Sequence, residues 1–351
     1  MTPRSPCSRG VLLLCAACVA CTAASRRPEH AGPADAGARS TRPASPAALP
    51  RPPDHASTAP TGPGFPEAGP WLSFYGTALQ MGDLARVAGA FRVIDVDADP
   101  GRGEGDGNFT DEELAVLRNG GRNKVLSYLN IGSCERFRTY WQSAPAGLLP
   151  CDANRAARLG AYEGYPDETW MDPGNGDYQR LIVEHVAARL EARGVDGFYL
   201  DNLEIVEHVT PGAALGWCSP GCRQGGLDLV RKLRERFPRM LLVMQNATGE
   251  TTRLGVTGGV PFSALLDGIV HEEVYSPAFD AQAERQLLEW QAAAARRPGE
   301  RPLFIGVEDY VGSCRNTDAA RTVYEKSRRH GFSPYVSDAS ASQKVVCYWP
   351  F

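Results

Sequence analysis

Two acidic residues, Asp201 and Glu272, each end a short apolar run that follows an Asp-Gly pair. A buried strand that ends in a carboxylate can deliver an acid or a base to the edge of a sheet. Two such carboxylates can hydrolyse a glycosidic bond, because one donates a proton to the leaving oxygen while the other attacks the anomeric carbon or activates water. The alternation of side chains along the second run does not decide between Glu272 and Glu273. We therefore predict a two-carboxylate site, with helix capping as the alternative role of Asp201.

Polar residues also follow the other apolar runs, at the positions where strands of a parallel sheet would end. In a barrel these ends gather on one face, where such folds keep their active sites. Aromatic side chains near them could stack on sugar rings while carboxylates and amides bond hydroxyl groups, although any single aromatic residue could equally fill the core. The predicted substrate-binding residues are Asp95, Asp97, Tyr128, Asn130, Trp170, Asp172, Asn202, Asn246, Tyr275 and Asp309.

The elements that must position these residues alternate between apolar strands and amphipathic helices. Helices are expected over 110–119, 177–193, 227–237, 280–296 and 317–330. Nine strands are expected, over 71–75, 91–97, 124–131, 169–172, 198–200, 240–245, 267–273, 302–308 and 334–336. This alternation predicts an α/β fold, a (β/α)8 TIM barrel in a single domain, with an open doubly wound sheet as the alternative. Because a barrel has eight places, either 169–172 or 334–336 is expected to be accessory.

The N-terminal region has the composition of an exported protein. Residues 1–24 read as a signal peptide, because two arginines precede an apolar core and small residues follow it. Residues 25–69 are rich in Pro and Ala and are predicted to be a disordered linker, which leaves 70–351 for the barrel. Cys18 and Cys21 each follow two small residues, as at a bacterial lipoprotein cleavage site. We expect an exported protein, either secreted or attached to the membrane of the cell envelope through lipid on one of these cysteines.

The net charge of −4 offers no basic face for nucleic acid. The six cysteines beyond the leader are an even number in an oxidising compartment, so they predict three disulfides. Fifteen pairings are possible, and proximity along the chain favours Cys134 with Cys151, Cys218 with Cys222, and Cys314 with Cys347. A zinc site is the weaker alternative, because no second cysteine pair or histidine stands at ligand spacing from Cys218 and Cys222.

Several motifs together carry a family resemblance. They are Val-Leu-Ser-Tyr-Leu-Asn-Ile-Gly at 125–132, Trp-Met-Asp at 170–172, Gly-Phe-Tyr-Leu-Asp-Asn at 197–202, Gln-Asn at 245–246 and Asp-Gly-Ile-Val-His-Glu-Glu at 267–273. With these motifs the chain resembles glycoside hydrolase family 114, whose members look like (β/α)8 enzymes typified by secreted endo-α-1,4-polygalactosaminidases. The likeness implies that Asp201 and Glu272 are the catalytic carboxylates, and that Asp95 or Asp97 and Asp309 belong to the pocket. It departs at Ser133, where the family usually has glutamate.

The resemblance and the carboxylates together predict an exported glycosidase without a cofactor. Its expected substrate is an α-linked, galactosamine-containing polysaccharide, whose ammonium groups an acidic mouth would neutralise. Glu272 is expected to be the acid/base, and Asp201 the nucleophile or its helper. A non-catalytic, cell-surface carbohydrate-binding barrel is the alternative, which Ser133 makes conceivable. A third possibility is a lyase or isomerase with magnesium bound by Asp201, Glu272 and Asp309.

Overall fold

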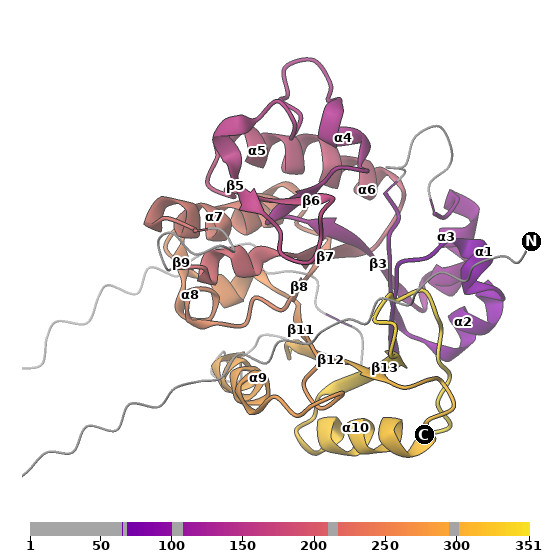
Figure 1. The fold of residues 1–351 in the computed structure, drawn as a ribbon. Helices are drawn as coiled ribbons and strands as arrows, with labels where there is room; N and C mark the ends of the chain where they lie inside the picture. The colour runs from indigo at the N-terminus through magenta and orange to yellow at the C-terminus, as the bar shows by residue number, and fades with distance from the viewer. Residues whose placement is uncertain (1–64, 66–68, 100–107, 210–216, 295–301) are drawn as a thin grey trace, which may run out of the picture. The chain divides into compact units, whose positions relative to one another are not determined.

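The computed structural model of this protein describes residues 65, 69–99, 108–209, 217–294 and 302–351 (Figure 1). The predicted signal peptide and almost all of the predicted linker lie outside the described residues. The part described lies within one compact unit, His55–Phe351. No helix in these ranges is long and apolar enough to cross a membrane.

Eight strands form the central sheet, and every pair of neighbours is parallel. In spatial order they are β1 (Trp71–Phe74), β2 (Val93–Val96), β3 (Lys124–Asn130), β7 (Gly197–Asp201), β8 (Leu241–Gln245), β11 (Gly268–Glu272), β12 (Phe304–Val311) and β13 (Ser333–Asp338). The Trp71 indole donates to the Ser333 carbonyl at 2.7 Å, which brings the first strand beside the last. The predicted TIM barrel is therefore confirmed, and a doubly wound sheet is excluded because the spatial order follows the chain order without a switch point.

The Asp-Gly pairs before β7 and β11 have a structural explanation. A Cβ on Gly197 would come within 2.4 Å of the Leu241 carbonyl oxygen, so only glycine fits against the next strand. The Asp196 carboxylate accepts the Val125 amide at 3.0 Å, and the Asp267 carboxylate accepts the Leu242 amide at 2.9 Å. Each aspartate thus binds the start of its own strand to the neighbouring strand, β3 or β8. The opposite ends of these two strands carry Asp201 and Glu272.

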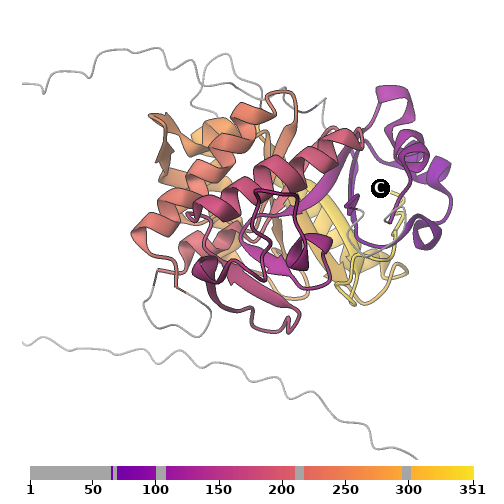
Figure 2. The same ribbon diagram turned by 90° about the horizontal axis from the view of Figure 1, so that it is seen from above.

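Helices lie on the outer side of the strands (Figure 2). The longer ones are α2 (Leu84–Ala90), α3 (Asp111–Arg118), α7 (Pro220–Arg236), α9 (Ala281–Ala294), α10 (Thr317–Arg329) and a continuous helix made of α5 (Gly176–Arg180), η3 (Leu181–Ala187) and α6 (Ala188–Ala192). The capping box expected before α3 is present, with Thr110 and Glu113 each bonding the backbone amide of the other. Helix α7 begins seven residues earlier than predicted, because Ser219 caps it and Pro220 suits its first turn.

Short elements occupy the connections. They are α1 (Ala78–Met81), η1 (Asn119–Gly121), α4 (Thr139–Gln142), η2 (Arg155–Ala157), η4 (Leu203–Glu207), α8 (Glu250–Leu254), β9 (Val256–Thr257), β10 (Val260–Pro261) and η5 (Phe262–Leu265).

An insert between β3 and α5 carries a second, antiparallel sheet of three strands. Its members are β4 (Ser133–Glu135), β5 (Arg158–Ala161) and β6 (Glu168–Met171), with β6 in the centre. Of the nine expected strands, 169–172 is therefore the accessory one, and 334–336 lies in the barrel as part of β13.

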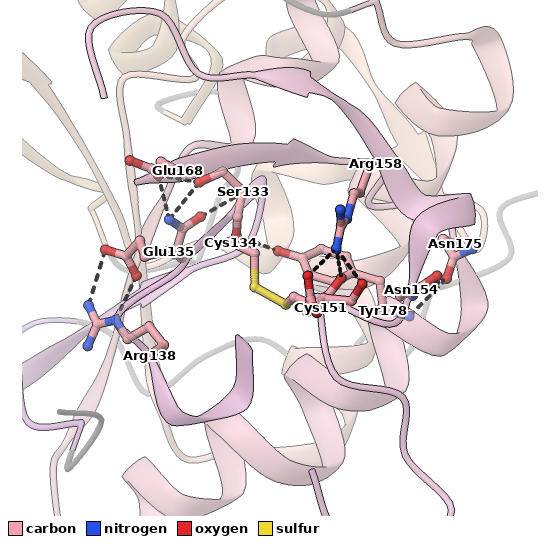
Figure 3. Close-up of a disulfide and its surroundings, with 12 residues drawn as sticks. Ser133, Cys134, Glu135, Arg138, Cys151, Asn154, Arg158, Glu168, Asn175 and Tyr178 are labelled. Atoms are coloured by element: carbon pink, nitrogen blue, oxygen red, sulfur yellow. Dashed lines mark hydrogen bonds and ion pairs between the residues drawn. A yellow bond between two sulfur atoms is a disulfide. The ribbon is translucent and has the colours of Figure 1, made fainter. Parts of the chain in front are cut away.

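The three predicted disulfides are all present. Cys134 pairs with Cys151 within the insert, as Figure 3 shows, Cys218 with Cys222 at the start of α7, and Cys314 with Cys347 near the C-terminus. Since Cys218 and Cys222 are bonded to each other, the zinc alternative at that pair is wrong.

Candidate active site

Carboxylates from four strands converge at the ends of β2, β7, β11 and β12. Tyr199, only 1% exposed, lies among them, and the pKa of its hydroxyl is raised well above the usual range. Burial is the main cause, followed by the charges of Glu308, Asp95, Glu272 and Asp201. The pKa of Asp201 is likewise raised, first by burial and then by repulsion from Glu204 and Glu272. The two predicted catalytic carboxylates therefore face one site.

Glu272 is held by three side-chain donors. Asn246 donates to its Oε2 at 2.8 Å, Gln343 donates to its Oε1 at 3.2 Å, and the Tyr310 hydroxyl donates to the same Oε1. The Glu272 amide in turn donates to the Asn246 side-chain oxygen at 3.0 Å. These bonds fix the Glu272 carboxylate in one orientation among the site residues, whereas Glu273 is exposed.

Asp201 and its neighbour Glu204 share a strongly desolvated environment. Glu204 lies on η4, and burial together with the charges of Glu272 and Glu168 raises its pKa to about 7. A hydrogen bond from Tyr128 partly offsets the rise in the pKa of Asp201. Because crowded carboxylates do not readily all ionise, this pair favours a retained proton near neutral pH.

A fourth carboxylate, Glu168, stands beside this group. Its Oε1 accepts Asn130 Nδ2 at 2.9 Å, Asn202 Nδ2 at 2.8 Å and the Ser133 hydroxyl. Figure 3 shows Glu168 beside Ser133. Two of the three predicted amide residues, Asn130 and Asn202, thus meet at this carboxylate, and Ser133 lies within the same cluster.

Asp95 and Glu308 form the floor of the site, and neither is exposed. The Tyr75 hydroxyl donates to Asp95 Oδ2 at 2.6 Å, and burial raises the pKa of both carboxyls well above their usual range. Asp97 has a different environment, because Arg138 Nη1 contacts its Oδ1 at 2.9 Å. We therefore place Asp95 in the site and assign Asp97 to a buried ion pair beside it.

Comparison with known proteins gives the site a family context. Residues 59–216 match the model of glycoside hydrolase family GH114. The predicted resemblance to GH114 is thereby confirmed. A protein of Deinococcus radiodurans is 25% identical over 237 residues, which cover 63% of this chain and 66%, just under two thirds, of that relative.

Two solved structures share the fold. The glycoside hydrolase domain of PelA from Pseudomonas aeruginosa has 17% identity and a TM-score of 0.57, covering 80% of this chain and 97% of that one. Ega3 of Aspergillus fumigatus, solved in complex with galactosamine, has 13% identity and a TM-score of 0.53, covering 80% and 93%. The GH114 match supports a glycoside hydrolase. The matched residues include Asp201, Glu204 and Glu168, whereas Glu272 lies beyond them, at the end of the barrel strand β11.

Not every predicted residue reaches the candidate site. Asp172 accepts the Gly174 amide at 2.7 Å and so closes a turn. Asp309 Oδ1 accepts the amides of Tyr275 at 2.9 Å and Ser276 at 3.0 Å, so it orders the loop after β11. Within the described residues, no cluster of His, Cys, Asp and Glu is arranged to hold a metal ion.

The two remaining aromatic candidates differ in their surroundings. Tyr275 stacks on Phe279, with 6.1 Å between ring centroids, on the loop that Asp309 orders. Trp170 stacks on Tyr162 at 4.1 Å, and the Tyr162 hydroxyl reaches Asn202 at 3.2 Å and Glu204 at 3.4 Å. The buried Trp170 therefore supports Tyr162 from behind, and Tyr162 is the aromatic residue that contacts the site carboxylates.

The residues of the site that were not predicted from the sequence include Tyr162, Glu168, Glu204, Glu308 and Gln343. Glu308 has a signal in the sequence, because it follows Gly306 by two residues in β12, and alternation places both on the same face of the strand. Glu204 follows Asp201 by three residues on a 3₁₀ turn, a spacing that returns to the same side. Glu168 and Gln343 arrive from the insert and the C-terminal segment through contacts between distant parts of the chain, for which the sequence has no local signal.

Proposed function

We propose that this protein hydrolyses an α-linked, galactosamine-containing polysaccharide with Asp201 and Glu272 as its catalytic pair. The observation that supports this best is the convergence of these two carboxylates, from β7 and β11, on one acidic site. The substrate class is supported by the GH114 match and by the fold shared with Ega3, which was solved with galactosamine.

In this mechanism Glu272 is the acid/base and Asp201 the nucleophile or its helper. The nucleophile must be ionised, whereas burial and repulsion from Glu204 raise the pKa of Asp201 in the free site. An ammonium group on the substrate would offset that repulsion, because a nearby opposite charge favours the ionised form of a carboxyl group. Binding of a de-N-acetylated sugar would therefore prepare Asp201 for reaction.

The pair is tested by incubating the purified protein with de-N-acetylated polygalactosamine and measuring the oligosaccharides released. We expect Asp201→Asn and Glu272→Gln each to lower kcat by at least about 10³-fold, since each removes a group that acts on the reacting bond. Glu273→Gln, a matched change one residue along, should have a far smaller effect. Restoration of turnover in Asp201→Ala by added azide would identify Asp201 as the nucleophile.

Other outcomes would reject the proposal. Unchanged activity in Asp201→Asn would remove that residue from the pair. Binding of the polymer by the wild-type protein without release of product would favour the non-catalytic carbohydrate-binding protein instead.

We also infer that the protein is exported, either secreted or attached to the membrane of the cell envelope through lipid on Cys18 or Cys21. The leader composition supports export, and so do the three disulfides, which persist in oxidising compartments.

A further inference from the structure

The turn between β5 and β6 reaches the catalytic carboxylates from the side of the insert. It runs from Tyr162 to Glu168, whose backbones bond at 3.3 Å, and Glu168 also donates its amide to the Tyr165 carbonyl at 3.0 Å. Both ends of the turn contact site residues, because Tyr162 bonds Asn202 and Glu204 while Glu168 bonds Asn130 and Asn202. The turn is therefore one wall of the site.

Glu168 is the carboxylate of this wall. Its Oε1 receives the three donors described above, so the carboxylate has a fixed position at the junction of β3, β4 and β7. No described residue donates a hydrogen bond to its Oε2, and in Figure 3 this carboxylate lies well apart from the disulfide that ties the insert. One oxygen thus anchors the side chain and the other is left for a ligand.

Among the described residues, no cationic side chain forms an ion pair with the Glu168 carboxylate. Among the residues that the structure describes, Asp201, Glu204, Glu272 and Glu168 take part in none of the ion pairs. The nearby buried cation, Arg138, is bound by Asp97 at 2.9 Å and by Glu135 at 2.6 Å. A cationic ligand would supply the missing charge.

An aromatic platform completes the wall. Tyr165 is 60% exposed, and its ring meets that of Tyr162 edge to face, with 5.0 Å between centroids. Tyr162 is in turn stacked on the buried Trp170. Exposed aromatic rings supported from behind are suited to stack on the apolar face of a sugar.

We propose that Tyr165 and Glu168 form a subsite for one cationic amino-sugar unit beside the scissile bond, with the ring stacked on Tyr165 and the ammonium bound by Glu168. The inference rests on the proposed glycosidase function for its location in a reaction, but the binding it describes can be measured without turnover. Tyr165 and Glu168 are here binding residues that determine specificity, not members of the catalytic pair.

Calorimetric titration of the Glu272→Gln variant with galactosamine oligosaccharides tests the subsite, with N-acetylated oligosaccharides as the uncharged comparison. We expect additional Glu168→Gln to weaken binding of the cationic ligand at least about tenfold, a loss of about 1.4 kcal/mol, and to leave the N-acetylated ligand almost unaffected. Tyr165→Ala should weaken both ligands about fivefold, whereas Tyr165→Phe should weaken neither, because the ring and not the hydroxyl is used.

Glu163→Gln is the matched control, because it removes the same charge from the same turn at an exposed position. If Glu163→Gln and Glu168→Gln weakened binding of the cationic oligosaccharide equally, the effect would come from the overall negative charge of the turn, and the subsite would be rejected. It would also be rejected if Glu168→Gln weakened binding of the cationic and the N-acetylated oligosaccharides equally. Lack of any binding of the cationic oligosaccharide would also overturn it. Binding with the expected pattern but no turnover by the wild-type protein would reject the proposed catalysis alone.

Discussion

At the scale of single residues, the site is a set of like charges held close together. Asp95, Asp201, Glu204 and Glu308 all have raised pKa values, and burial is the leading cause for each. Placing so many carboxyls in a poorly solvated site costs stability, since the ionised forms lose water and repel one another. These carboxyl groups therefore lower the stability of the folded protein. In the proposed function they also hold a proton and attract a cationic sugar.

The cost can be measured at Glu204. Its pKa is raised in the folded state to about 7, above the ordinary value of 4.5, so the folded state binds more protons than the unfolded state between these values. Stability contributed by this group is full below about pH 4.5 and is lost as pH rises toward 7. Glu204→Gln should therefore raise the free energy of unfolding at pH 8, by on the order of 2 kcal/mol, and leave it unchanged at pH 4. Urea unfolding of both proteins at the two pH values measures this, and an equal effect at both would contradict it.

At the scale of elements, the barrel strands were predictable and the insert was not. Strands such as β7 and β8 are continuous apolar runs between helices, and a buried parallel sheet requires that pattern. The family resemblance predicted Asp309, whereas Glu308, one residue earlier on β12, is the carboxylate that faces Tyr199 and Glu272. Strand β6 has the same local character as a barrel strand, but its partners are β4 and β5, and only the folded chain decides that pairing.

A disulfide within the insert is expected to stabilise the turn from Tyr162 to Glu168, which forms one wall of the site. Cys134 lies on β4 between Ser133 and Glu135, and its bond to Cys151 closes 17 residues of chain. Replacing both cysteines with alanine should lower the free energy of unfolding by about 3 kcal/mol and weaken polymer binding, because Ser133 anchors Glu168. The matched double change at Cys218 and Cys222, which closes only 4 residues, should cost on the order of 1 kcal/mol less and spare binding. Thermal unfolding and KM together measure this, and a larger binding defect in the second protein would refute it.

At the scale of the whole molecule, the two ends of the barrel have different tasks. The N-terminal ends of the strands carry fixed ion pairs, such as Arg234 with Asp267 at 2.5 Å, which stabilise the sheet. The C-terminal halves of the strands carry the site carboxylates Asp201, Glu272 and Glu308, which form no ion pair among the described residues. Active sites of this fold usually lie at that end. The C-terminal segment joins these carboxylates, because Gln343 donates to Glu272, and the bond between Cys314 and Cys347 ties that segment to the loop after β12. This disulfide thus supports the site as well as the fold.

We predict that the protein is exported and that its leader is cleaved. The leader has the order of a signal peptide, and the disulfides need an oxidising compartment. Expressed in a bacterial host, the mature protein should lack the first residues, and mass spectrometry of its N-terminus should show a lipid-modified Cys18 or Cys21. Alanine in place of both cysteines should then release the protein from the membrane fraction without changing its activity. An unmodified N-terminus after residue 24 would instead identify a secreted protein, and retention of the intact leader in an active, disulfide-bonded product would refute cleavage.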